Sequence, residues 1–173
     1  MTKAAADRLF VEPGLDWRPV SPKLLTERRL PVLVGAIVGV GLIVVALLAR
    51  SAGASGASLA LGIPGLVIAL VAAGLWIVVL PRIVSSWRYA EREQDLLVSH
   101  GRLNRHLAVV PYGRMQVIEV TANPVSSHLG IATITLVTAS AKTDARIPGL
   151  PVDAAHQLRD RLASKGEALS AGL

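Results

Sequence analysis

The sequence contains no cysteine and few aromatic residues. The absence of cysteine excludes disulfide bonds, catalytic thiolates and cysteine-ligated metal sites. One phenylalanine, two tyrosines and three tryptophans are all the aromatic side chains of these types, and single-stranded nucleic-acid binding relies on stacking bases against such rings. We therefore expect no nucleic-acid partner, although the formal net charge is +6.

Charged residues are also missing from two long stretches, residues 31–49 and residues 59–80, which are almost entirely Ala, Gly, Val, Leu and Ile. Each is close to the roughly 20 residues that a helix needs to cross a bilayer, and a helix satisfies its own backbone hydrogen bonds in lipid. We predict two transmembrane helices joined by an extracytoplasmic loop at residues 50–58, RSAGASGAS. A cleavable signal peptide is the alternative for the first stretch. The polar residues 1–30 and the length of the apolar run disfavour it, because signal peptides have apolar runs of about 7–15 residues.

Positive charges flank the two apolar stretches unequally. Within about 15 residues of the stretches, four precede the first, three follow the second, and the connecting loop holds one: Arg18, Lys23, Arg28, Arg29, then Arg82, Arg88, Arg92, against Arg50. Loops rich in Lys and Arg stay in the cytoplasm. The bias predicts a multi-pass protein of the cell (inner) membrane with both termini, including the segment 1–30, on the cytoplasmic side.

Small residues recur at four-residue spacing in both predicted spans, at Gly35 and Gly39 and at Gly65, Ala69 and Ala73. Such stripes let helix backbones approach closely in lipid. They predict packing of the two helices against each other. Docking against the helices of a larger membrane complex is the alternative. Neither span carries an ionisable residue, which a transport pathway normally needs.

The second half of the chain changes to short strands and turns. The segment LLVSHGRLNRHLAVVPYG predicts two strands joined near Gly101, with Leu103, Leu107 and Val109 on one face of the second. Pro111 is predicted to open the next strand, MQVIEVTA, in which Val117, Ile118 and Val120 supply core. That strand closes at Asn123-Pro124, and IATITLVTA and ARIPGL are further strands.

A helix is expected after the last strand. Asp153 suits its N-cap, and Gly166 can end it. An apolar stripe runs along it through Ala154 or Ala155, Leu158 and Leu162. Several strands followed by one amphipathic helix predict an antiparallel sheet or open barrel covered by a C-terminal helix. The predicted fold class is thus a membrane α-helical hairpin plus a small mainly-β domain.

The strand series resembles the bacterial pleckstrin-homology-like (PH-like) membrane proteins, the YdbS-like group. The resemblance lies in the order of LLVSHGRLNRHLAVVPYGRMQVIEVTANPVSSHLGIATITLVTAS, ARIPGL and AAHQLRDRLA, and it covers roughly residues 85–163. It implies a cytoplasmic PH-like domain at residues 85–165, an open barrel capped by the terminal helix, with residues 166–173 as a flexible tail. His128 departs from the family pattern, which more often has Arg before Leu-Gly.

A basic cluster is the candidate contact site: Arg102, Arg105, His106 and Arg114, in a stretch without acidic residues. Near an anionic leaflet each cation gains about 1 kcal/mol, so lipid headgroups or an acidic partner are the expected ligands. A solvated strand face that binds nothing specific is the alternative.

No residue set indicates catalysis. The four histidines lack metal-ligand spacing, the serines Ser126, Ser127 and Ser140 lack a nucleophile elbow, and no phosphate loop is present. We therefore expect no enzymatic activity, cofactor, metal or small-molecule substrate. The predicted function is a membrane-anchored PH-like binding or scaffold module whose partners are membrane lipids and a membrane protein. The alternative is an accessory subunit of a transport or envelope-stress complex.

Overall fold

The computed structural model describes residues 14–138 and 144–171. The described residues form two compact units, one made of residues 28–82 and the other of residues 14–27 together with residues 83–171. The first unit is therefore an insertion in the second. Because residue 27 and residue 83 both belong to the second unit, the chain leaves that unit at residue 28 and returns to it after residue 82.

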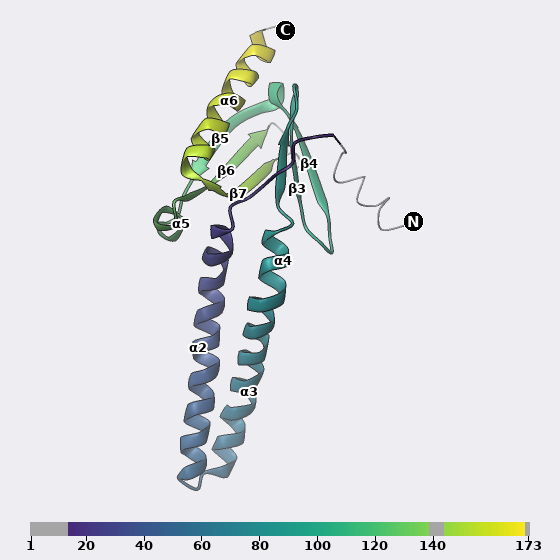
Figure 1. The fold of residues 1–173 in the computed structure, drawn as a ribbon. Helices are drawn as coiled ribbons and strands as arrows, with labels where there is room; N and C mark the ends of the chain where they lie inside the picture. Colours follow the sequence, from purple (N-terminus) through teal and green to yellow (C-terminus); the bar gives the residue numbers. More distant parts are fainter. Residues whose placement is uncertain (1–13, 139–143, 172–173) are drawn as a thin grey trace, which may run out of the picture. The chain divides into compact units, whose positions relative to one another are not determined.

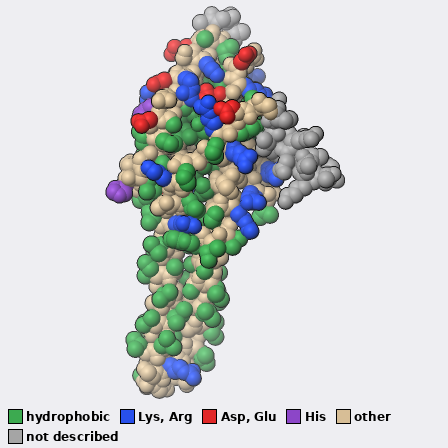
Figure 2. Space-filling model, viewed as in Figure 1, with side chains coloured by type: hydrophobic (Ala, Val, Ile, Leu, Met, Phe, Trp, Pro, Cys, Tyr) green, Lys and Arg blue, Asp and Glu red, His purple; other side chains and the backbone are tan. Residues whose placement is uncertain are grey.

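The inserted unit is a helical hairpin. Helix α2 (Lys23–Ser51) is followed after a three-residue turn by α3 (Ser55–Gly74), a π-helical turn η1 (Leu75–Val79) and α4 (Leu80–Val84). Figure 1 shows the two long helices side by side, and Figure 2 shows hydrophobic side chains covering their visible face. Both helices are long and apolar enough to cross a membrane. The predicted apolar spans lie inside them, but the turn is shorter than the predicted loop at residues 50–58.

The other unit contains two antiparallel sheets. The first has the order β1 (Arg18–Pro19), β2 (Arg88–Glu91), β3 (Asp95–His100), β4 (His106–Pro111). The second has the order β5 (Met115–Thr121), β6 (Ile131–Thr138), β7 (Ala145–Pro151). Short helices η2 (Tyr112–Arg114) and α5 (Pro124–Leu129) connect strands, and α6 (Val152–Ala171) follows β7. Among the described residues these strands do not close into a barrel.

The predicted antiparallel sheets with a C-terminal helix are confirmed. Alternate residues of β6 point into the core, and Ile134 and Leu136 are completely buried there. On α6, the predicted stripe of Ala155, Leu158 and Leu162 is completely buried as well. Alternate residues of the strand and residues three or four apart on the helix therefore face the same hydrophobic core.

The segment before the hairpin belongs to this core, which the sequence did not predict. Strand β1 pairs with β2, and Leu24 at the start of α2 is 2% exposed. The amide of Ser21 donates to the carbonyl of Gly149 at 2.9 Å. Gly149 has φ +69°, and a Cβ there would lie 2.7 Å from the Cβ of Leu24. Residues 14–27 are thus a structural part of the β unit.

Several local predictions were wrong. Pro111 is the last residue of β4, and Leu103 lies in the turn before that strand. Val117 is 49% exposed because it faces away from the core shared by Ile118 and Val120. In a strand, neighbouring side chains point to opposite faces, so these three cannot all be core.

Two helix boundaries also differ from the prediction. Asn123 and Pro124 begin helix α5, where the Asn123 side chain accepts a hydrogen bond from the amide of Ser126 at 2.7 Å. Helix α6 continues through Gly166 to Ala171, and Asp153 lies inside its first turn. Ser140, and Ala139 at the end of the predicted strand IATITLVTA, lie outside the described residues.

Candidate functional site

The turn between β3 and β4 presents a basic tip, residues 101–105. Gly101 has φ +94°, and a Cβ at this position would collide with the carbonyl oxygen of Asn104, so only glycine fits this bend. Arg102 is exposed, Arg105 is half-buried, and Leu103 between them has a fully exposed side chain. Two cations thus flank one unprotected leucine.

A stack of aromatic rings supports the basic tip. The rings of Trp87 and His100 lie 4.2 Å apart, and those of His100 and His106 lie 5.3 Å apart. Burial lowers the pKa of His100, and the neighbouring positive charge of His106 lowers it further. The amide of Gly101 donates to the Ser86 hydroxyl at 3.1 Å. This bond ties the tip to a residue that follows the end of α4 closely.

Arg114 does not belong to the basic tip. His106 pairs with His100 at one end of the β3–β4 ladder, whereas Pro111 pairs with Asp95 at the other end. Arg114 follows Pro111 in η2, so the length of a six-residue strand, about 17 Å, separates it from the tip. The four basic residues predicted to form one cluster therefore lie in two separate places: Arg102, Arg105 and His106 at one end of β4, and Arg114 beyond the other end.

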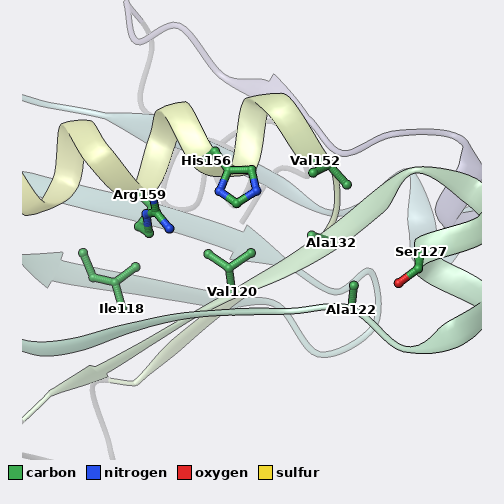
Figure 3. A pocket seen from close by; sticks show the side chains of 8 residues that line it. All are labelled: Ile118, Val120, Ala122, Ser127, Ala132, Val152, His156 and Arg159. Carbon is green, nitrogen blue, oxygen red and sulfur yellow. The ribbon is translucent and has the colours of Figure 1, made fainter.

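A groove of about 460 Å³ lies between α6 and β5. Figure 3 shows Ile118, Val120 and Ala122 along one wall and His156 and Arg159 pointing from α6 toward them. Val152, Ala132 and Ser127 complete its lining. The groove residues come from two separate segments of the sequence, residues 118–132 and residues 152–159, and no local motif marks them.

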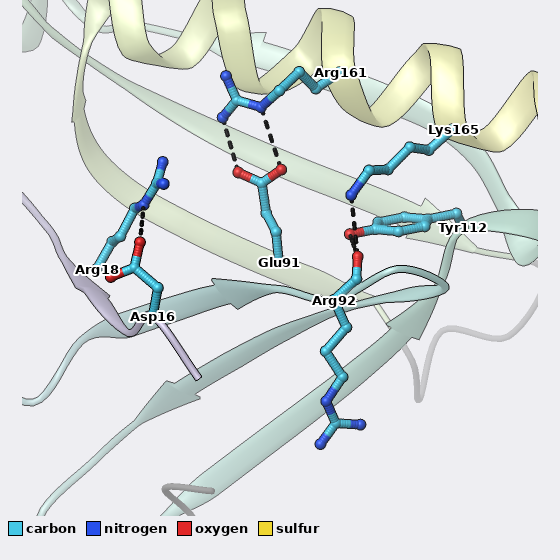
Figure 4. Close-up of polar contacts among 7 residues, drawn as sticks. All are labelled: Asp16, Arg18, Glu91, Arg92, Tyr112, Arg161 and Lys165. Carbon is cyan, nitrogen blue, oxygen red and sulfur yellow. Dashed lines mark hydrogen bonds and ion pairs between the residues drawn. The ribbon is translucent and has the colours of Figure 1, made fainter. Parts of the chain in front are cut away.

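Polar contacts fasten α6 to the first sheet (Figure 4). Arg161 donates two hydrogen bonds to the carboxylate of Glu91, at 2.8 and 3.2 Å. The Tyr112 hydroxyl and the Lys165 ammonium both donate to the carbonyl of Arg92 at 3.0 Å, and Lys165 Nζ lies 4.9 Å from the centre of the Tyr112 ring. Burial raises the pKa of Tyr112 to about 12. These contacts hold the middle of the helix in place.

The small residues of the hairpin divide into two groups. A Cβ on Gly39 would lie 2.9 Å from the amide nitrogen of Ala69, and a Cβ on Gly65 would lie 2.9 Å from the carbonyl oxygen of Gly39. These three residues bring the two helices together. A Cβ on Gly35 would meet nothing within 4 Å, and Ala73 is exposed, whereas its neighbour Ala72 is buried.

The base of the hairpin carries a cation–π contact that the sequence did not suggest. The Arg29 guanidinium lies 4.9 Å from the centre of the Trp76 ring, a distance at which the ring face attracts the charge. Among the described residues no group of three or more His, Asp or Glu could hold a metal ion.

Comparison with known proteins identifies the fold family. A family model described as Bacterial PH domain matches residues 29–166, well over half of the chain. The comparison with curated proteins and that with solved structures gave no match. The narrower YdbS-like grouping stays a prediction. Two antiparallel sheets, a C-terminal helix and this match together show that the chain belongs to the bacterial PH domain family.

Proposed function

We propose that this chain is a non-enzymatic, membrane-anchored binding module. Its hairpin crosses the inner membrane, and its PH-like unit lies on the cytoplasmic side, where it holds a partner near the lipid surface. The observation that carries the proposal is the insertion of the hairpin between β1 and β2 of one folded unit. Since both hairpin ends join that unit, two crossings return the chain to the side from which it started.

The surface of the hairpin supports insertion into lipid. Large apolar side chains are exposed along both helices, including Ile37, Leu47, Ile63 and Leu70, each more than half exposed. Soluble proteins rarely expose contiguous apolar surface beyond a few hundred Å². In the hydrocarbon core of a bilayer, such a surface is not exposed to water and carries no hydration penalty. The excess of Arg and Lys outside the interhelical turn favours the cytoplasmic side for the PH-like unit.

Labelling of single cysteines tests this topology directly, because the chain has none of its own. Ala54→Cys lies in the interhelical turn, and Ser164→Cys lies on α6. We expect a membrane-impermeant maleimide to label Ala54→Cys in intact cells and Ser164→Cys only after permeabilisation. Equal labelling of both variants in intact cells, or the reverse pattern, contradicts the proposal.

The basic tip is the proposed lipid contact. Its hydrogen bond to Ser86 holds it near the end of α4, where the chain leaves the bilayer in this proposal. Arg102 and Arg105 suit anionic headgroups at about 1 kcal/mol per cation. Burying the Leu103 side chain in the interface adds up to about 2 kcal/mol.

A dye on Asn104→Cys measures this contact in the full chain in nanodiscs. We expect a blue-shifted emission in anionic nanodiscs, and a loss of the shift in zwitterionic lipid or when Leu103→Asp is added. The matched control is Thr121→Cys, on exposed β5, whose dye should not respond to lipid charge. An unchanged spectrum for Asn104→Cys in all lipids leaves the basic tip as a solvated turn.

The accessory-subunit function has one favourable observation. The Gly41 and Gly74 positions have no neighbour within 4 Å of a built Cβ, so backbone surface of the hairpin is open to another helix. Crosslinking from Gly41→Cys in native membranes distinguishes the two functions. Capture of a foreign membrane protein there favours the subunit, and an absence of any adduct favours the independent module.

A further inference from the structure

We propose that the groove between α6 and β5 binds an extended acidic peptide segment of a partner protein, which adds as a strand to the edge of β5. The proposal rests on the binding function proposed above and deepens it by naming the chemistry of the partner. Three independent features of the groove carry it: an unprotected strand edge, an apolar wall with two-residue spacing, and a basic side facing that wall.

The edge of β5 is unusual among the four sheet edges. In the part of the chain that the structure describes, β5 pairs with β6 only, so one row of its backbone groups has no strand partner. Proteins protect such edges with proline, lysine or a very short strand. Strand β1 has two residues including Pro19, β7 contains Pro148 and Pro151, and β4 ends at Pro111.

Strand β5 has none of these protections. Its seven residues, MQVIEVT, contain neither proline nor lysine and are rich in β-branched side chains. An edge of this length and composition pairs readily with another extended chain. Each of the other three edge strands contains proline, so β5, beyond the irregular register at Met115–Val117, is the place where a strand can be added.

The wall of the groove matches the side-chain spacing of such a strand. Ile118, Val120 and Ala122 occupy alternate positions and line the groove together. A strand added beside them would also direct every second side chain into the groove. The volume of about 460 Å³ accepts a few small apolar side chains. The backbone edge then gives affinity, and the groove gives selectivity.

The opposite side of the groove selects for negative charge. His156 and Arg159 project from α6, and no acidic residue is among the lining residues. Arg159 Nη2 lies 2.7 Å from Asp160 Oδ1, but the two side chains are 43% and 65% exposed. An exposed pair of this kind contributes at most about 1 kcal/mol, so a partner carboxylate can compete for the guanidinium.

Glu119 defines which face of the partner strand carries the acid. It is exposed and alternates with Ile118 and Val120, so it lies on the face of β5 away from the groove. A carboxylate on that face of the partner would be repelled. The partner segment therefore has small apolar residues and one Asp or Glu on the groove side, and no acidic residue directly opposite Glu119.

Selection from a displayed library of random peptides tests the inference with the full chain in nanodiscs. We expect enrichment of segments with alternating apolar residues and one acidic residue on the same face. Fluorescence anisotropy of the enriched peptide should show about tenfold weaker binding to Arg159→Gln. Methylation of alternate backbone nitrogens of the peptide should abolish binding, because it removes the strand donors.

Two variants block the groove, and one is their matched control. Val120→Glu places a negative charge in the wall, where it repels an acidic peptide, and Ala122→Trp fills the groove from an exposed position. Both should reduce binding at least tenfold. Val117→Glu changes the same strand on the opposite face and should alter binding less than twofold.

Three results overturn the inference: no enrichment over the Ala122→Trp variant, enrichment of basic peptides, or full binding of the methylated peptide. A fourth result would also overturn it: the chain forms a dimer, binds no peptide, and becomes a monomer when Ala122→Trp is introduced. The edge of β5 would then pair with a second copy of the chain. None of these results changes the cysteine labelling pattern, so failure here is distinguishable from failure of the proposed anchoring.

Discussion

Arg161 on α6 and Glu91 on β2 form a two-pronged ion pair across seventy residues of sequence, with N–O distances of 2.8 and 3.2 Å. The hydrogen bonds that Arg161 donates to the Glu91 carboxylate raise the pKa of Arg161. Only an arginine has the planar fork that makes both bonds to one carboxylate. The pair therefore joins the middle of α6 to β2.

Replacing Arg161 with lysine should cost about 0.5–1 kcal/mol of unfolding free energy, because one of the two bonds is lost while the charge stays. Urea unfolding of the full chain in nanodiscs, followed by tryptophan fluorescence, measures the loss. Arg159→Lys is the matched control on the same helix, since its partner Asp160 is its neighbour in sequence, and it should change stability by less than about 0.3 kcal/mol. Equal losses for both variants would show that the Glu91 pair has no special role.

Tyr112 should make the unit that contains the two sheets less stable at alkaline pH. Its pKa is raised from 10.0 to about 12 in the folded state, so the phenol is protonated over a wider range when folded. The stabilisation is complete below pH 10 and is lost as the pH rises through 12. We expect the wild-type unfolding free energy to fall on the order of 2 kcal/mol over that window.

Tyr112→Phe should remove most of this fall and should cost about 1 kcal/mol at pH 7 through the lost bond to the Arg92 carbonyl. Unfolding free energies measured in parallel at pH 7, 9.5 and 11.5 check both effects. Identical pH profiles for the two proteins would contradict the prediction.

Leu24 should behave as a core residue of the β unit although it precedes the hairpin in sequence. Leu24→Ala should destabilise the unit by about 2–4 kcal/mol, since the side chain is 2% exposed. Thr26→Ala, at an exposed position two residues later, is the control and should cost less than about 0.5 kcal/mol.

A second substitution identifies the contact that Leu24 makes. Gly149→Ala should destabilise the unit because of its positive φ and its close approach to Leu24. In the double variant Leu24→Gly/Gly149→Ala the loss should be smaller than the sum of the two single losses, because glycine removes the Leu24 Cβ, the atom nearest to the new methyl group. Additive losses in chemical unfolding would mean that the two positions do not touch.

The hairpin should close with an engineered disulfide. A Cβ built on Gly62 lies 3.4 Å from the Cβ of Ala46, close to the separation of about 3.5–4.5 Å in disulfides. Ala46→Cys/Gly62→Cys should therefore crosslink within one chain under mild oxidation, seen as a mobility shift on non-reducing gels. Gly41→Cys/Gly74→Cys, at positions with open surroundings, should not. A crosslink between chains in the first variant would favour docking over an internal hairpin.

The sequence was sufficient for the elements with long, regular patterns. The helices around residues 31–49 and 59–80 follow from composition alone, and the alternation in β6 and the stripe on α6 follow from their periods. The two residues of β1 are too few to show a period, and their partner β2 lies beyond the hairpin. Helix α5 was readable in principle, because Asn123 followed by Pro124 is a typical helix start.

The candidate sites were less predictable because they depend on where turns place neighbouring residues. Arg102 and Arg114 are close in sequence but lie at opposite ends of β4. The groove joins Val120 with His156, whose association requires β7 and α6 to be in place. Leu103 had a local signal, an apolar residue between two arginines after a glycine, but its position in a turn was not predicted.

The pairing of Pro19 with Arg88 sets an order for biosynthesis. The first strand leaves the ribosome long before its partner exists, and closing so large a loop costs conformational entropy. Contacts of Gly39 with Gly65 and of Arg29 with Trp76 form between segments made in the interval, so the paired helices shorten the search. If the hairpin is anchored in a membrane as proposed, its insertion is a step in folding the unit that holds the sheets, and a chain that fails to insert leaves its first strand without a partner.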